Sequence, residues 1–147
     1  MITPGTLLNL ESWCVVAGLV LVSSGCAVPT EADQTALIRE VQRTVPVCHE
    51  SKECEVKWAA ARDWVVKNTG RRLLHETNDY LDTSNPINSS IESIEVRVIK
   101  EPQPDGSYRI TATVWCNSFT GCVPDRWVAL KRFNDTVNAS WHPALAQ

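Results

Sequence analysis

The segment Trp115–Pro124 constrains the fold more than any other part of the sequence. An alternating apolar pattern typical of a β-strand leads into it, and a helical pattern follows it. Cys116 and Cys122 lie six positions apart within the segment, so a disulfide between them could lock the turn. The segment therefore predicts a joint that fixes a helix next to the end of a strand.

The strand before this joint belongs to a predicted hairpin. Apolar residues alternate with polar or mixed ones in two runs, at Ile94, Val96 and Val98 and again at Tyr108, Ile110, Ala112 and Val114. Asp105-Gly106 supplies a turn between the two runs, and Pro102 and Pro104 resist strand pairing there. Each strand then has one apolar face, as in an antiparallel sheet that is covered on one side.

Helical patterns occupy three other stretches. Residues 30–45 begin with a capping threonine, and residues 51–70 have acids in the first turn and a glycine at the end. Apolar residues recur at three- and four-residue steps after Asp125. Residues 71–84 fit two short strands or one bent strand. The sequence predicts an α+β fold with two N-terminal helices, a three- to four-stranded antiparallel sheet and a C-terminal helix packed on one face.

The amino terminus predicts export. An unbroken apolar run from Trp13 to Val22 precedes Ser23-Ser24-Gly25-Cys26. Ten apolar residues fit a secretory signal and fall short of the ~20 that span a bilayer. The small residues before Cys26 resemble the lipobox of bacterial lipoproteins, in which this cysteine is lipidated and becomes the first residue.

Two features depart from that pattern, because Ser23 stands where an aliphatic residue is usual and Glu11 where a positive charge is expected. A plain cleaved secretion signal and an uncleaved anchor are the alternatives. The preferred organisation is a lipoprotein signal peptide over residues 1–25, a lipidated tether over 26–30 and a single globular domain over 31–147.

The cysteine count fits the same interpretation. Cleavage before Cys26 would remove Cys14, and lipid on Cys26 would leave four cysteines, at Cys48, Cys54, Cys116 and Cys122. Four cysteines allow three disulfide connectivities, and the repeated Cys-x5-Cys spacing favours the two local pairs. Zinc sites use closer cysteine pairs, and no Cys-x-x-Cys redox motif occurs. We therefore expect disulfides and no metal or cofactor.

The sequence contains no motif of catalysis or nucleic-acid binding. His75 and Glu76 are neighbours in a strand pattern, so their side chains should point to opposite faces. His49 follows a cysteine that is predicted to be bridged, and His142 lies near the C-terminus. The 14 basic and 17 acidic residues form no run of one sign, which argues against a nucleic-acid partner. A non-enzymatic role is preferred.

Aromatic residues are the remaining candidates for a binding surface. An exposed Trp64, Trp115 or Trp141 could anchor a protein or a sugar ring, because aromatics dominate binding hot spots. The alternative is that all five tryptophans of the mature chain fill a small core. Asn117 and Phe119, at the tip of the joint, are further candidate contacts.

Taken together, several motifs resemble a family of small uncharacterised lipoproteins of proteobacteria. The resemblance covers roughly Cys48 to Trp141. The motifs are Cys48…Glu53-Cys54-x3-Trp58-x-Ala60-Ala61-x2-Trp64-Val65, Asn85-Pro86, Glu101-Pro102…Gly106-Ser107-Tyr108, Cys116-Asn117-x-Phe119-x-Gly121-Cys122-x-Pro124 and Phe133-Asn134-x3-Asn138. The resemblance implies an exported, membrane-anchored domain with paired cysteines, and it implies no activity. Ala27 after Cys26 resembles lipoproteins that are sorted to the outer membrane.

These observations predict an outer-membrane lipoprotein whose domain faces the periplasm and binds an envelope protein or a cell-wall component. Its other partner would be the lipid bilayer, through the acyl chains on Cys26. The alternative is a periplasmic enzyme, or an inhibitor of one. A cleft that holds His75 with a carboxylate would favour the enzyme, and a flat surface centred on tryptophan would favour the binding domain.

Overall fold

The computed structural model describes residues 30–83 and 93–142, which form three helices and one five-stranded sheet. The signal segment, Cys26 and most of the predicted tether lie outside the described residues. Among the residues that are described, no helix has both the length and the apolar character needed to cross a membrane. The elements run in the order α1 Glu31–Arg43, β1 Val47–Cys48, α2 Ser51–Thr69, β2 Leu73–Glu76, β3 Tyr80–Thr83, β4 Glu95–Pro102, β5 Tyr108–Trp115 and α3 Arg126–Ala139.

The sheet is antiparallel throughout, with the spatial order β1-β5-β4-β3-β2. The predicted hairpin forms its centre, where Val96 lies opposite Val114 and Val98 lies opposite Ala112. Gly106 takes a positive φ of 84° in the connecting turn, a conformation that favours glycine. The α+β class and the antiparallel sheet agree with the prediction from the sequence.

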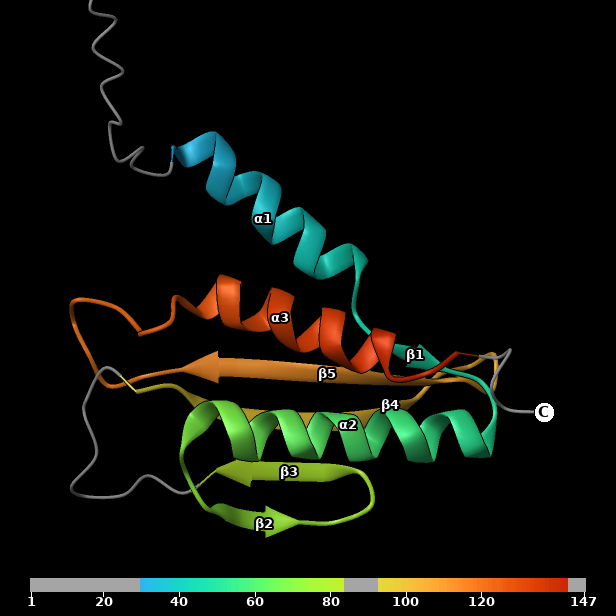
Figure 1. The fold of residues 1–147 in the computed structure, drawn as a ribbon. Coiled ribbons are helices and arrows are strands. Elements are labelled where there is room, and N and C mark those ends of the chain that lie inside the picture. The colour runs from blue at the N-terminus through green and yellow to red at the C-terminus, as the bar shows by residue number, and fades with distance from the viewer. Residues whose placement is uncertain (1–29, 84–92, 143–147) are drawn as a thin grey trace, which may run out of the picture.

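One face of the sheet carries the core. Figure 1 shows α2 and α3 next to each other along the sheet, with α1 outside α3. The strand residues that point toward α2 and α3 are buried, namely Leu81, Val96, Val98, Ile110 and Val114. Between the helices, the ring of Trp64 meets the ring of Phe133 edge-on at a centroid distance of 5.4 Å.

Side chains at the helix ends explain where two of the helices begin. Thr30 and Asp33 form a reciprocal capping box at the start of α1. The carboxylate of Asp125 accepts hydrogen bonds from the backbone N–H groups of Trp127 and Val128 and so caps α3. The joint that the sequence predicts between β5 and α3 therefore ends in a helix cap.

Two asparagines hold α1 against α3. The Asn134 side chain is buried and donates to the carbonyl of Val41 at 2.9 Å. Asn138 donates to the carbonyl of Thr44 at 2.8 Å. These carbonyls lie at the C-terminal end of α1, where no later backbone N–H of the helix remains to donate to them. The first helix is thereby attached to the rest of the domain.

The number of strands differs from the prediction, because the sheet has five strands and not three to four. Residues 71–83 contain two strands, β2 and β3. This agrees with the expectation of two short strands and not with that of one bent strand. The strand that the sequence analysis did not anticipate is β1, which separates the two N-terminal helices and pairs with β5 through Val47 and Cys48. Two residues are too few to show an alternating pattern, so only the pairing with β5 identifies this strand.

Candidate functional site

Both predicted local disulfides are present, and their surroundings differ. Cys48 and Cys54 are bonded with a Cα–Cα distance of 5.1 Å, and both residues are buried. Cys116 and Cys122 are bonded with a Cα–Cα distance of 5.5 Å, and both are only half-buried. The first disulfide belongs to the core, whereas the second closes a loop at the surface.

A buried ion pair lies beside the first disulfide. The Glu53 carboxylate accepts a hydrogen bond from the backbone N–H of His49 at 2.8 Å and pairs with the Lys57 ammonium at 2.7 Å. Lys57 also donates to the carbonyl of Val47 at 2.6 Å. Burial by itself would raise the pKa of Glu53, but the hydrogen bonds from Lys57 and His49 and the charge of Lys57 outweigh it and lower that pKa. This cluster ties β1 to the first turns of α2 and has a structural role.

The four residues predicted to contact a partner do not form one site. Trp64 is 5% exposed and belongs to the core. Asn117 and Phe119 lie on the loop before α3, whereas the half-buried Trp141 follows the C-terminal end of α3. Asn117 donates to Glu95 at 3.4 Å, and Phe119 is 96% exposed. A helix of this length separates its ends by about 20 Å, so Trp141 and the loop are distant from each other.

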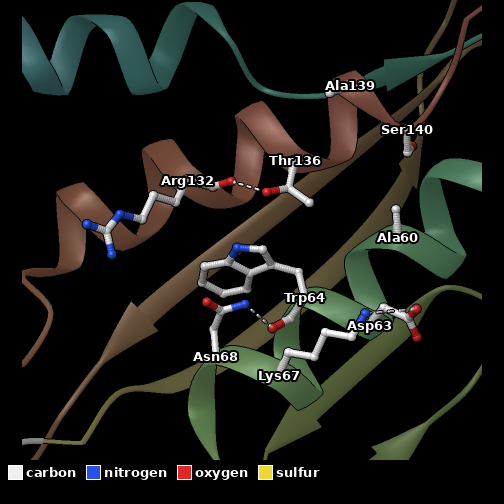
Figure 2. Close-up of a pocket in the computed structure, with 9 residues that line it drawn as sticks. All are labelled: Ala60, Asp63, Trp64, Lys67, Asn68, Arg132, Thr136, Ala139 and Ser140. Carbon is white, nitrogen blue, oxygen red and sulfur yellow. Dashed lines mark hydrogen bonds and ion pairs between the residues drawn. The ribbon is translucent and has the colours of Figure 1, made fainter.

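The edge of Trp64 forms the floor of a groove between α2 and α3. Figure 2 shows the indole lying between the two helices, with Asp63 and Lys67 on the α2 side. The groove has a volume of about 700 Å³, and Arg132 and Thr136 line its α3 side. Asp63 and Lys67 pair with each other at 3.8 Å, and Thr136 donates to the carbonyl of Arg132. Because its polar groups largely bond to one another, the groove favours no particular class of ligand.

A more distinctive set of side chains lies on the side of the sheet that faces away from α2 and α3, which we call the open face. Strand side chains alternate between the two faces, so the residues between the core positions point outward. None of the described helices lies on this side (Figure 1). The open face consists of His75, Tyr80, Asp82, Glu95, Arg97, Ile99, Glu101, Arg109, Thr111, Thr113 and Trp115. Glu95 is the buried member of this set.

Arg97 occupies the middle of the open face, between two aromatic rings. Its guanidinium carbon is 5.9 Å from the ring centroid of Tyr80 and 5.6 Å from that of Trp115. Both distances fall within the range of cation–π attraction. The register explains the arrangement. Asp82 and Thr113 lie opposite Arg97 on the two neighbouring strands, and Tyr80 and Trp115 are each two residues farther along, at the diagonal positions on the same face.

Asp82 lies beside this cluster. Its Oδ2 atom accepts a hydrogen bond from the Tyr80 hydroxyl at 3.2 Å and lies 3.9 Å from an Arg97 nitrogen. Its Oδ1 atom is buried and accepts no hydrogen bond from the described part of the chain. The carboxylate therefore supports the position of both the ring and the guanidinium. The cluster presents a cation and two rings on one surface, with the largely buried Asp82 carboxylate beside them.

The open face also contains His75, which would favour an enzyme if it lay in a cleft together with a carboxylate. His75 pairs with Asp82 across β2 and β3, and its Nδ1 lies 4.0 Å from Asp82 Oδ2, beyond hydrogen-bond distance. The His75 side chain is 63% exposed, and it is not among the residues that line the groove between α2 and α3. Glu76 points to the other face, toward Arg62, as the alternation predicts. His75 therefore lies on an exposed strand surface beside Asp82.

Metal binding has no structural support in residues 30–83 and 93–142, where no three potential ligands from His, Cys, Asp and Glu come together. The four cysteines that could have served as ligands are used in the two disulfides.

The sequence indicated only part of the open face. The sequence predicts Trp115 as a candidate exposed anchor, but it does not indicate that Tyr80, Asp82 and Arg97 are its neighbours. The alternation places Arg97 and Trp115 away from the core, and this signal could have been used. The position of Tyr80 next to Arg97 depends on the register of β3 against β4, and the position of His75 depends on the irregularity in β2 between Leu73 and His75.

The family resemblance noted from the sequence finds no independent support. Comparison of the chain with known protein families, characterised proteins and solved structures finds no match.

Proposed function

We propose that this protein is an outer-membrane lipoprotein whose periplasmic domain binds another envelope protein through the open face. The observation that carries the proposal is the placement of Arg97 between the rings of Tyr80 and Trp115, on a sheet face that no described helix covers. The binding is non-enzymatic.

The residue types favour a protein partner. Arginine, tyrosine and tryptophan are the residues most enriched at the centres of protein–protein interfaces. The Arg97 side chain is 46% exposed, so an acidic group of a partner can reach its guanidinium. Thr111 and Thr113 on β5 offer hydroxyl groups next to it. An exposed sheet face suits a partner that is itself a folded protein.

Two other observations support export and anchoring. Disulfides form and persist in oxidising compartments such as the periplasm, and this domain contains two of them. The apolar run before Ser23-Ser24-Gly25-Cys26 fits a lipoprotein signal. Ala27 after Cys26 fits sorting to the outer membrane.

The partner-binding role is tested by crosslinking in cells, followed by mass spectrometry of the captured proteins. Arg97→Ala and Trp115→Ala should each lower recovery of the partner about tenfold or more, as expected for hot-spot residues. Arg132→Ala on α3 is the matched control, because it removes an exposed arginine from the other side of the molecule. Recovery of the same proteins at wild-type yield from both open-face variants would contradict the proposal.

A second measurement separates a protein partner from a cell-wall glycan. Wild-type domain is sedimented with purified peptidoglycan in the absence of other proteins. We expect the domain to remain in the supernatant. Co-sedimentation that is lost in Trp115→Ala would show that the open face binds a sugar ring instead.

The anchor has its own test. Cys26→Ser should release the protein from the membrane fraction, because the acyl chains would be lost. Retention of this variant in the membrane fraction would exclude lipidation of Cys26 as the means of attachment.

A further inference from the structure

The loop closed by the second disulfide and the residue that follows it present two apolar side chains to solvent. Phe119 is 96% exposed and Val123 is 65% exposed, and both are among the most exposed large apolar residues of the described chain. Single exposed apolar residues are common on protein surfaces. Here, two of them belong to one short loop that projects beyond the sheet, at the left of Figure 1.

The loop is held in shape before it meets any partner. The Cys116–Cys122 disulfide closes it, and the hydroxyl groups of Ser118 and Thr120 lie 2.6 Å apart in a hydrogen bond. The backbone N–H of Thr120 also donates to the Ser118 hydroxyl at 3.2 Å. A loop that is already ordered loses little conformational entropy when it binds. Its polar groups at the tip are partly satisfied internally, which lowers the cost of moving them out of water.

The loop lies beside the beginning of the first helix. Gln34 of α1 lines the same pocket as Ser118 and Gly121 of the loop. Asp33 and Gln34 line a second, adjoining pocket together with Asp125. The start of α1 and the loop are therefore at the same end of the domain, as Figure 1 also shows.

Covalent geometry connects that end of the domain to the bilayer. Thr30 follows Cys26 by four residues. A fully extended chain of this length spans at most about 14 Å. If Cys26 is lipidated, as the proposed function holds, the start of α1 cannot move farther than this from the membrane surface, and the loop must remain close to it.

We infer that residues 117–123 form a membrane-contacting loop, in which Phe119 and Val123 enter the interfacial region of the bilayer next to the lipid anchor. The inference rests on the anchoring part of the proposed function. The loop would act as a second attachment point, so it would restrict the tilt of the domain and the direction in which the open face points.

The test attaches the domain to vesicles chemically, so that it does not depend on lipidation in the cell. The chain from Cys26 to Gln147 keeps the whole described core and both disulfides, which leaves Cys26 as its free thiol. This thiol is coupled to a maleimide phospholipid in vesicles that contain phosphatidylethanolamine and anionic phosphatidylglycerol, because interfacial binding depends on lipid composition. A photoreactive benzoylphenylalanine replaces Phe119, and products are identified by mass.

The control places the same photoreactive residue at Tyr108. Tyr108 is 40% exposed and begins β5, whereas the loop follows the end of that strand. An eight-residue strand spans about 25 Å, so this position should stay away from the bilayer. Because burial of a phenylalanine favours the inserted state about tenfold or more, lipid adducts should form at position 119 and exceed those at 108 by a similar factor.

Equal lipid adducts at both positions, or none at position 119, would overturn the inference. Adducts between two copies of the domain would show that the loop binds a second copy instead. Adducts in cells to an envelope protein, with none to lipid, would assign the loop to a protein partner. Failure of anchoring in cells would appear separately, as wild-type protein in the soluble fraction, and it would leave the vesicle result unchanged.

Discussion

The two disulfide loops have the same cysteine spacing in the sequence, but one is buried in the structure and the other is exposed. Cys48 and Cys54 are completely or nearly buried, and Cys48 lies in β1 where it pairs with Tyr108. Cys116 and Cys122 are half-buried, and the loop between them exposes Phe119 almost fully. The comparison shows that cysteine spacing predicts the covalent loop but not its role.

The difference arises from what surrounds each loop. The first loop is held by the Glu53–Lys57 ion pair and by the pairing of β1 with β5. Removal of its disulfide therefore affects several elements at once. The second connects β5 to α3, and the cap of α3 is provided independently by Asp125. The first loop therefore stabilises the core, and the second presents a surface.

The largest expected effect comes from removing each disulfide in turn. Cys48→Ala with Cys54→Ala should lower the free energy of unfolding by about 4 kcal/mol, since loop entropy and the packing of two buried sulfurs are both lost. Cys116→Ala with Cys122→Ala should lower it by about 2 kcal/mol, mainly through loop entropy. Urea denaturation of both variants measures the difference. Equal losses in the free energy of unfolding would contradict the view that the first disulfide stabilises the core more than the second.

Breaking the buried ion pair should have the next largest effect. Glu53→Gln leaves the Lys57 ammonium buried without its counter-charge, and we expect a loss of about 3 kcal/mol in the free energy of unfolding. Asp135→Asn is the matched control, because Asp135 pairs with Lys131 over the same spacing but in an exposed position. The control should lose less than about 0.5 kcal/mol. Similar losses in the two variants would mean that burial of the first pair is unimportant.

The same pair predicts a pH dependence. The pKa of Glu53 in the folded domain lies below its ordinary value of 4.5, so the ionised form is favoured by folding. This contribution to stability is fully present above the ordinary pKa and disappears as the pH falls through the lower pKa of the folded state. Urea denaturation between pH 7 and pH 3 should show a smaller acid destabilisation in Glu53→Gln than in the wild type. Identical pH profiles would be inconsistent with a lowered pKa at Glu53.

The smallest effect on stability is expected in the second loop. Phe119→Ser removes a side chain that is 96% exposed, and the free energy of unfolding should change by less than about 0.5 kcal/mol. Thermal unfolding of the domain in the absence of membranes measures this. A loss of more than 1 kcal/mol would place Phe119 among the structural residues and weaken its assignment to a binding surface.

Several features of the fold follow from local sequence patterns. The alternation at Val96 and Val98, and at Ile110 and Val114, predicted the central hairpin with its apolar face toward the helices. The helix after Asp125 was recognisable from its apolar spacing, and the local pairing of the cysteines from their separation. These features depend on backbone periodicity, capping and chain connectivity, and all three act between residues that are near one another in the sequence.

Other features were decided only when distant segments packed together. Trp64, a candidate for an exposed contact, is buried because Phe133 of α3 meets its ring. The strand β1 exists because β5 pairs with it, and Arg97 lies between Tyr80 and Trp115 because of the register between three strands.

The two cysteine loops show the same limit most clearly. The sequence by itself determined that each pair of cysteines could close a short loop. The tertiary structure alone decided that one loop lies within the core while the other exposes Phe119, because burial depends on which elements of the whole chain surround a segment and not on the segment itself.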